Sequence, residues 1–190
     1  MAKTKKSAGK KTAPLAGIQP EEAACVLQRL LAIHPELVPE AEEIWRLSMD
    51  EVSFETIAFD VESSILSLDL DDLNNRAGSH SWGYVEPSEA ALELLDEAVA
   101  PFREDMLRKL ELGLEAAAFE TCKGIVFGLY QCRNPTEGDP LSWAPDFPVE
   151  AASYAVCKLN GDRKPGAMFD FGEFVDEYVS EWQWLAGRAG

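Results

Sequence analysis

The chain has 190 residues, 46% of them hydrophobic and 27% charged, which is the composition of a globular protein of one domain or two small ones. With 17 basic and 34 acidic residues its net charge is −17, which argues against an extensive nucleic-acid or anionic-membrane surface. No apolar run approaches the ~18 residues of a membrane span, and residues 1–17 lack the apolar core of a secretory signal. We therefore expect a cytoplasmic protein.

The N-terminus differs from the rest of the chain in charge. Five lysines and no acidic residue stand in the first 11 positions, at Lys3, Lys5, Lys6, Lys10 and Lys11. Residues 1–17 hold little to bury, so we predict a disordered tail followed by a single all-α domain over 18–190. A lysine-rich tail without arginine or aromatic residues predicts at most weak, unspecific contact with nucleic acid.

Apolar residues recur at helical spacing along most of the chain. In chain order, helices are predicted to begin at Pro20, near Glu36, at Ser53, at Pro87, at Leu114, near Val149 and near Asp170. Pro101 falls inside the fourth helix, so we expect a kink or break just before it. The polar connection 69–87 and the proline-rich segment 134–148 are predicted loops, and no strand is predicted because no segment alternates with period two.

The most apolar segment runs from Leu114 to about Cys132 and carries two glycines on one helical face. Gly124 and Gly128 are four residues apart, a spacing that lets another helix approach closely. Charged residues interrupt the segment, so it predicts a central buried helix rather than a membrane span.

The pattern Pro-x-Glu-Ala-Ala occurs three times, beginning at Pro20, Pro87 and Pro148. Proline suits the first position of a helix, glutamate its first turn, and alanine its propagation, so the pattern describes a helix start. Similar proline spacings after two of the copies also suit a repeated helical hairpin. The arrangement resembles HEAT- or TPR-like helical repeats in style but lacks the consensus of either. A short stack of hairpins and an irregular helical bundle stay open as architectures.

The cysteines and one histidine have structural interpretations. Four cysteines at scattered positions, Cys25, Cys122, Cys132 and Cys157, predict buried, reduced thiols rather than a zinc site. His34 stands directly before Pro35 and is predicted to cap a helix end, with a role as general base as the alternative. No phosphate-binding glycine loop and no local nucleophile–histidine set occurs, so we predict no catalytic residues and no cofactor.

The connection 69–87 is the best candidate for metal chemistry. Asp69, Asp71, Asp72 and His80 lie within it, and hard divalent cations prefer oxygen ligands. The spacing does not fit an EF-hand, and the alternative is that the aspartates end one helix and begin a turn.

Aromatic residues supply the candidate partner-binding side chains, at Trp82, Tyr84, Trp143 and Trp184. The final helix is rich in aromatic residues, and Phe171, Phe174, Tyr178 and Trp182 are expected to face the core. Trp184 lies on another face, where contact with a partner and packing within the chain are both open.

The first hypothesis is a non-enzymatic helical interaction or adaptor protein. Its acidic surface would steer a partner protein of basic character, and the aromatic residues would anchor it. The alternatives are a divalent-metal-dependent enzyme or metal-binding protein that uses the Asp69–His80 segment, and an acidic mimic of nucleic acid.

Overall fold

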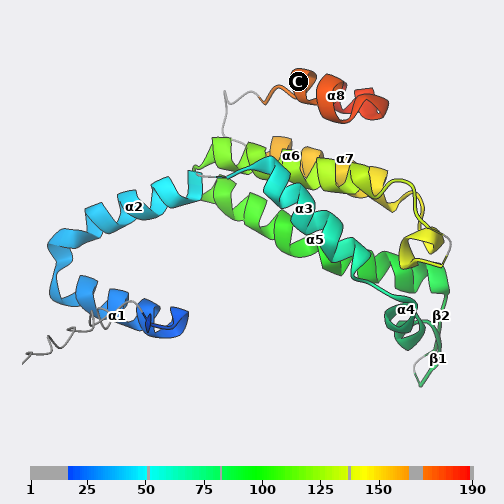
Figure 1. Ribbon diagram of the computed structural model, residues 1–190, viewed down its shortest axis with the longest axis horizontal. Coiled ribbons are helices and arrows are strands. Elements are labelled where there is room, and N and C mark those ends of the chain that lie inside the picture. The colour runs from blue at the N-terminus through cyan, green and yellow to red at the C-terminus, as the bar shows by residue number, and fades with distance from the viewer. Residues whose placement is uncertain (1–16, 51, 82, 137, 163–168, 189–190) are drawn as a thin grey trace, which may run out of the picture. The chain divides into compact units, whose positions relative to one another are not determined.

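The computed structural model describes residues 17–50, 52–81, 83–136, 138–162 and 169–188 (Figure 1). The described residues are mostly helical, which confirms the all-α prediction apart from one short hairpin. The tail predicted over 1–17 lies outside this part of the chain, except for the exposed Gly17. Among the described residues, no helix is long and apolar enough to cross a membrane.

Contacts divide the chain into two units, Met1–Trp45 and Arg46–Gly190, here called the N-terminal and the C-terminal unit. The boundary falls inside α2. The prediction of a single domain over 18–190 stays a prediction.

The N-terminal unit contains α1 (Pro20–Ile33), the short helix η2 (Pro35–Leu37) and the first part of α2 (Val38–Asp50). Pro20 begins α1, and Glu22 accepts a hydrogen bond from the Gln19 backbone N–H at 3.1 Å. His34 stands at the C-terminal end of α1, as predicted, with its Nδ1 3.0 Å from the Glu36 carboxylate. No described residue of α1 or η2 is buried, so this unit has little core of its own.

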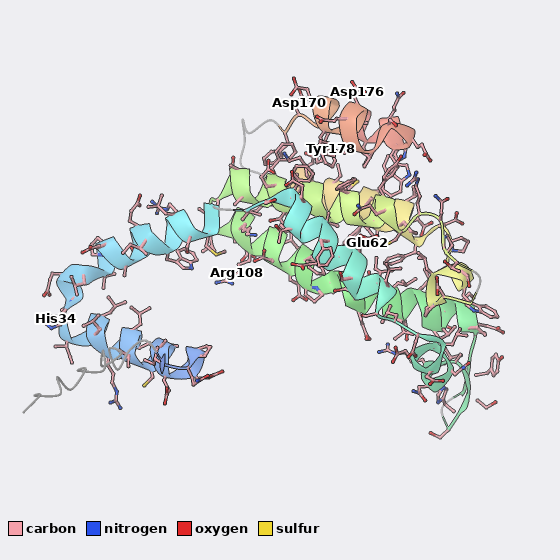
Figure 2. The ribbon with its side chains drawn as sticks, viewed as in Figure 1. His34, Glu62, Arg108, Asp170, Asp176 and Tyr178 are labelled. Carbon is pink, nitrogen blue, oxygen red and sulfur yellow. The ribbon has the colours of Figure 1, made fainter. Side chains whose placement is uncertain are left out.

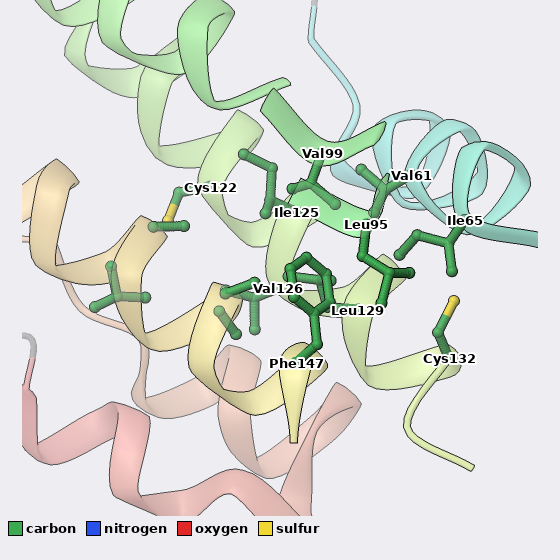
Figure 3. Packing of buried hydrophobic residues seen from close by; sticks show 14 of the residues in the cluster. Val61, Ile65, Leu95, Val99, Cys122, Ile125, Val126, Leu129, Cys132 and Phe147 are labelled. Atoms are coloured by element: carbon green, nitrogen blue, oxygen red, sulfur yellow. The ribbon is translucent and has the colours of Figure 1, made fainter. Parts of the chain in front are cut away.

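The body of the C-terminal unit consists of α3 (Phe54–Leu66), α5 (Pro87–Glu111), α6 (Glu115–Gln131) and α7 (Phe147–Asp162). The apolar segment predicted to be central is α6, which packs against α3, α5 and α7 (Figure 1). Figure 3 shows the buried side chains that meet there, among them Val61, Ile65, Leu95, Val99, Ile125, Val126, Leu129 and Phe147. One helix contacted by three others is the arrangement of an irregular bundle.

The two glycines of α6 lie where α3 approaches most closely. A Cβ added to Gly124 would stand 2.5 Å from the Cβ of Ile57, and one added to Gly128 would stand 2.6 Å from the carbonyl oxygen of Ala58. Both distances are far shorter than ordinary contacts, so glycine is needed at these positions for the backbones to approach. The prediction of a central buried helix is confirmed.

All three Pro-x-Glu-Ala-Ala segments lie at helix starts. Pro20 and Pro87 begin α1 and α5, and Pro148 is the second residue of α7. α5 and α7 contribute to the core, whereas no residue of α1 is buried. The three copies of the pattern therefore share a position at the start of a helix, although these helices differ in how far they are buried.

The connection 69–87 is more ordered than predicted. It contains α4 (Leu70–Arg76) and two antiparallel strands, β1 (Gly78–His80) and β2 (Gly83–Val85), with Ser79 opposite Tyr84. The expectation that the chain has no strands is therefore wrong. Strands of three residues are too short to show alternation, and the positive φ angles of Gly78 (101°) and Gly83 (150°) permit the tight hairpin.

Of the kink or break expected just before Pro101, the break is wrong, because α5 continues through this residue to Glu111, whereas a kink stays a prediction. A proline inside a helix removes one backbone hydrogen bond and crowds the preceding turn. Val99 and Met106, on either side of Pro101, are fully buried, so packing against the core holds the helix together.

The prediction of four buried cysteines is wrong for two of them. Cys122 and Cys132 are buried, whereas Cys25 and Cys157 are exposed. Burial raises the pKa of both buried thiols, that of Cys132 to about 12 with a smaller contribution from Glu62. Neither buried thiol is thus present as the reactive thiolate at neutral pH.

The helix predicted to begin near Asp170 is divided in two. α8 (Gly172–Tyr178) ends before Val179, whose backbone angles are not helical, and the 3-10 helix η4 (Ser180–Arg188) follows. The predicted inward face holds despite the division: Phe171, Phe174 and Trp182 are buried, and Tyr178 packs at the edge of the core. Figure 2 shows Tyr178 directed toward the body of this unit, while Asp170 and Asp176 point away from it.

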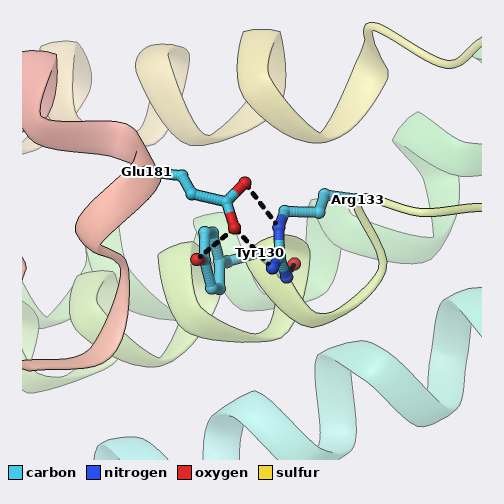
Figure 4. Close-up of polar contacts among 3 residues, drawn as sticks. All are labelled: Tyr130, Arg133 and Glu181. Carbon is cyan, nitrogen blue, oxygen red and sulfur yellow. Dashed lines mark hydrogen bonds and ion pairs between the residues drawn. The ribbon is translucent and has the colours of Figure 1, made fainter.

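A polar cluster holds η4 to the end of α6 (Figure 4). The Arg133 guanidinium donates to both Glu181 carboxylate oxygens at 2.9 and 3.2 Å, and the Tyr130 hydroxyl donates to one of them at 3.2 Å. The hydrogen bond from Arg133 is the main cause that lowers the pKa of Glu181 below its ordinary value of 4.5.

Glu181→Gln is expected to lower stability slightly at neutral pH, because an exposed ion pair contributes little. Since the pKa of Glu181 is lowered by folding, its stabilisation is present above 4.5 and is lost as pH falls through the folded value. Urea unfolding at a series of pH values should therefore show a difference from the native protein that is largest near pH 7 and shrinks as the pH falls below 4.5. Glu173→Gln, at an exposed carboxylate of α8 outside this cluster, serves as the control for the loss of one surface charge at pH 7.

Candidate functional site

An open groove of about 640 Å³ lies on the C-terminal unit between α5 and α7. Its apolar lining comes from Leu92, Phe147, Ala151 and Tyr154. Four carboxylates and one guanidinium also line it: Glu93, Asp96, Glu97, Glu150 and Arg103. We call this the α5–α7 groove.

Helical spacing places these side chains beside one another. On α5, Leu94 and Leu95 face the core, which turns Glu93 and Asp96 outward. On α7, Ala151 is buried while Glu150 and Tyr154, four residues apart, lie on the exposed side. The tyrosine is 50% exposed although its ring lines the groove.

Two cations flank the tyrosine ring. The Arg103 guanidinium carbon lies 5.3 Å from the ring centroid of Tyr154, and the Lys158 ammonium lies 5.7 Å from it. Arg103 also donates to Asp96 at 2.7 Å, and its side chain is only 13% exposed. These contacts hold the ring in one orientation before a partner binds, which reduces the ordering that binding requires.

The carboxylates of the α5–α7 groove differ in whether they pair with a basic side chain. Asp96 pairs with Arg103, and Glu97 accepts a hydrogen bond from Arg76 at 2.8 Å, which lowers the pKa of Glu97. Within the described residues, Glu93 and Glu150 form no ion pair. The groove therefore presents an excess of negative over positive side chains, four carboxylates against one guanidinium, next to exposed apolar surface.

A second groove of about 510 Å³ lies on the other side of the α7 residues Glu150 and Tyr154. It shares Glu150 and Tyr154 with the first groove, and adds Val149, Cys157 and Trp184. Tyr154 thus lies between two grooves. This arrangement suits an elongated ligand that contacts both sides of α7.

The predicted anchor residues that the structure describes lie on three different elements, β2, η3 and η4. Tyr84 is 61% exposed in β2, and Trp143 is 49% exposed in η3 (Pro140–Trp143), and neither lines the two grooves. Trp184 lines the second groove and packs partly on the core, 6.3 Å from Trp182 between ring centroids. Trp82 lies outside the described residues.

The sequence interpretation missed Tyr154, the central side chain of both grooves. A signal was present in the chain, because Glu150 and Tyr154 share a helical face, as do Glu93 and Glu97. The sequence could not show that the two faces meet, since α5 and α7 are far apart in the chain.

The residues predicted as candidate metal ligands form hydrogen bonds within the 69–87 connection. Asp69 precedes α4, and its carboxylate accepts from the backbone N–H groups of Asp71 and Asp72 at 2.8 and 2.9 Å. Asp72 accepts in return from the Asp69 N–H at 3.1 Å, which completes a capping box. His80 Nε2 lies 2.7 Å from the Arg76 carbonyl oxygen, to which it can only donate. In the described ranges, no group of three or more His, Cys, Asp and Glu residues is placed to hold a metal ion.

The side chains that line the two grooves are therefore suited to binding, with apolar, aromatic and carboxylate groups close together. Comparison of the chain with protein-family models, with curated proteins and with solved structures finds no match.

Proposed function

We propose that this protein is an interaction protein that binds a basic segment of a partner protein in the α5–α7 groove. The observation that carries the proposal is the exposed Tyr154 beside Glu93 and Glu150, two carboxylates without an ion pair in the described chain. An apolar anchor with unpaired carboxylates beside it recognises a segment that combines apolar residues with lysine or arginine.

The partner segment would place apolar side chains against Tyr154 and Leu92, and its basic side chains near Glu93 and Glu150. A groove of about 640 Å³ holds several such side chains. The surplus of acidic residues, 34 against 17 basic, accelerates the approach of a basic partner and repels acidic ones. We place the interaction in the cytoplasm, where the four cysteines would stay reduced.

The apolar lining of the α5–α7 groove argues against the alternative function, an acidic mimic of nucleic acid. A mimic of nucleic acid needs carboxylates at the spacing of phosphates, and an apolar lining adds nothing to that purpose. Here Leu92 and Tyr154, both substantially exposed, lie among the carboxylates. Large exposed apolar side chains ringed by charge are typical of protein-binding surfaces.

Replacing Tyr154 is expected to weaken partner binding strongly. Tyr154→Ala removes the central ring while leaving the buried face of α7 intact, and an anchor of this kind typically contributes at least about 2 kcal/mol, or roughly 30-fold in Kd. The native chain is immobilised, partners are captured from the native host at low salt, and the Kd of the purified partner is then measured.

Tyr84→Ala is the matched control, because Tyr84 is an exposed tyrosine that lies outside both grooves. The partner should bind this variant normally and should bind Glu150→Lys weakly. A partner that binds Tyr154→Ala as tightly as the native protein would rule out the groove as its site. Thermal unfolding of each variant checks that the fold is intact.

A further inference from the structure

The second groove adds apolar surface to that which the proposed function uses. Val149, Cys157 and Trp184 line it together with Glu150 and Tyr154, which also line the α5–α7 groove. Val149 is 37% exposed, and Trp184 packs partly on the core, which holds this wall in place. No basic side chain is among the described residues that line it. We call this groove the α7–η4 groove, and Glu150 with Tyr154 the α7 crest.

Helical spacing places the two grooves on neighbouring flanks of α7. Phe147 and Ala151 line the α5–α7 groove, whereas Val149 and Cys157 line the α7–η4 groove. At 100° per residue, the two pairs point roughly 140° apart, and the α7 crest lies between them. A path over the crest from one flank to the other is about 13 Å long at the ~5–6 Å outer radius of a helix.

We propose that the partner segment occupies both grooves at once, as an extended chain with the pattern apolar–x–basic–x–apolar. Its first apolar residue lies in the α5–α7 groove, so the inference rests on the proposed function. In an extended chain, residues four apart share a face and are about 13 Å apart. Two apolar side chains with this spacing reach one groove each across the α7 crest. The residue midway between them shares their face and stands over Glu150.

The charge at the α7 crest favours a basic residue in the middle position. Within the described residues, Glu150 forms no ion pair, so an incoming lysine or arginine meets an unpaired carboxylate. Lys158 contacts the ring of Tyr154 but lines neither groove. The three side chains also fix the register of the segment, since a shift by one residue would turn all of them away from α7.

An extended chain fits the two grooves better than a helix does. Two helices pack with their axes about 8–10 Å apart and, because both are convex, touch mainly where they cross. A helical partner would therefore contact the α7 crest and fill only one groove. An extended chain is narrower and can follow the curved surface of α7 from one groove to the other.

Three synthetic peptides, titrated into the native chain by isothermal titration calorimetry, test the pattern. The two-anchor peptide contains Leu-Ser-Lys-Ser-Leu. The one-anchor peptide has serine in place of the second leucine, and the acidic peptide has glutamate in place of the lysine. We expect the two-anchor peptide to bind at least about tenfold more tightly than either of the others, because each of them loses one anchor or reverses the central charge. Tyr154→Ala should weaken its binding strongly.

Alkylation by N-ethylmaleimide shows whether the second groove is filled. Cys157 is exposed and lines the α7–η4 groove, whereas Cys25 is exposed on α1 and serves as the internal reference. At a saturating concentration, the two-anchor peptide should slow alkylation of Cys157 several-fold and leave that of Cys25 unchanged. Mass spectrometry of the digested protein measures both rates in one sample.

The inference is overturned if the two-anchor peptide binds no more tightly than the one-anchor peptide, or if it leaves the alkylation rate of Cys157 unchanged. Absence of binding by the two-anchor peptide at about 1 mM overturns it as well. If Tyr154→Ala still weakens the binding of both peptides in the first two cases, the proposed function stands without the second groove. If Tyr154→Ala binds both peptides as tightly as the native chain, the α5–α7 groove is not their site and both proposals fail.

Discussion

Gly128→Ala is expected to lower the free energy of unfolding by about 2–3 kcal/mol, near the upper end of what overpacking a core typically costs. The added methyl group would stand 2.6 Å from the Ala58 carbonyl oxygen and 2.8 Å from the Cβ of Val61. One of these neighbours is backbone and the other is fully buried, so the strain is relieved only if α3 and α6 move apart. Urea unfolding followed by helical circular dichroism measures the effect.

Gly161→Ala is the matched control, since Gly161 is also in a helix but a Cβ there meets nothing within 4 Å. Alanine has the higher helix propensity, so this variant should be unchanged or more stable by up to about 1 kcal/mol. If both variants unfold at the same urea concentration as the native protein, the close approach of α3 and α6 is not as described.

The second large effect is expected at a buried lysine between α5 and α6. Lys109 is 4% exposed, and its ammonium donates to Asp105 at 2.6 Å and to Thr121 at 2.9 Å. Asp105→Ala leaves this charge buried without its counter-ion, which costs 3–5 kcal/mol in fully buried pairs. Because the Asp105 side chain is 41% exposed, we expect a smaller loss of about 2–4 kcal/mol in urea unfolding.

Lys109→Met should be much less harmful than Asp105→Ala, although it deletes the same ion pair. The methionine removes the buried charge and keeps most of the volume, and Asp105 remains solvated. The Thr121 hydroxyl still donates to the Ala117 carbonyl at 2.8 Å. Adding Lys109→Met to Asp105→Ala should restore most of the lost stability. If Lys109→Met is instead the more destabilising single variant, the ion pair itself stabilises the fold.

Local chemistry determined the helix starts and the helical character of the chain. Pro20 and Pro87 begin helices because a proline at the first position sacrifices no hydrogen bond, and α3 begins at Phe54, one residue after the predicted start at Ser53. The inward face of α8 and η4 was likewise readable from spacing, since Phe171, Phe174 and Trp182 are buried. Gly124 and Gly128 indicated where a helix would approach α6, but the sequence did not say which helix.

Tertiary packing decided the features that local rules predicted wrongly. α5 continues through Pro101 because burial of Val99 and Met106 outweighs the cost of one lost hydrogen bond, and the sequence around a proline does not show that burial. Cys25 and Cys157 are exposed although their neighbours are apolar, because an apolar helical stripe is buried only where another element covers it.

The candidate site also could not be predicted from the sequence, because it depends on which helices pack against each other. Tyr154, Glu93 and Glu150 form one surface only because α5 and α7, separated in the chain by α6, pack against each other. The sequence by itself determined the acidic charge, the helices and the apolar faces, since these follow from composition and periodicity. Which faces meet, and which remain open to a partner, was decided by packing between distant segments, and single-sequence periodicity does not specify that packing.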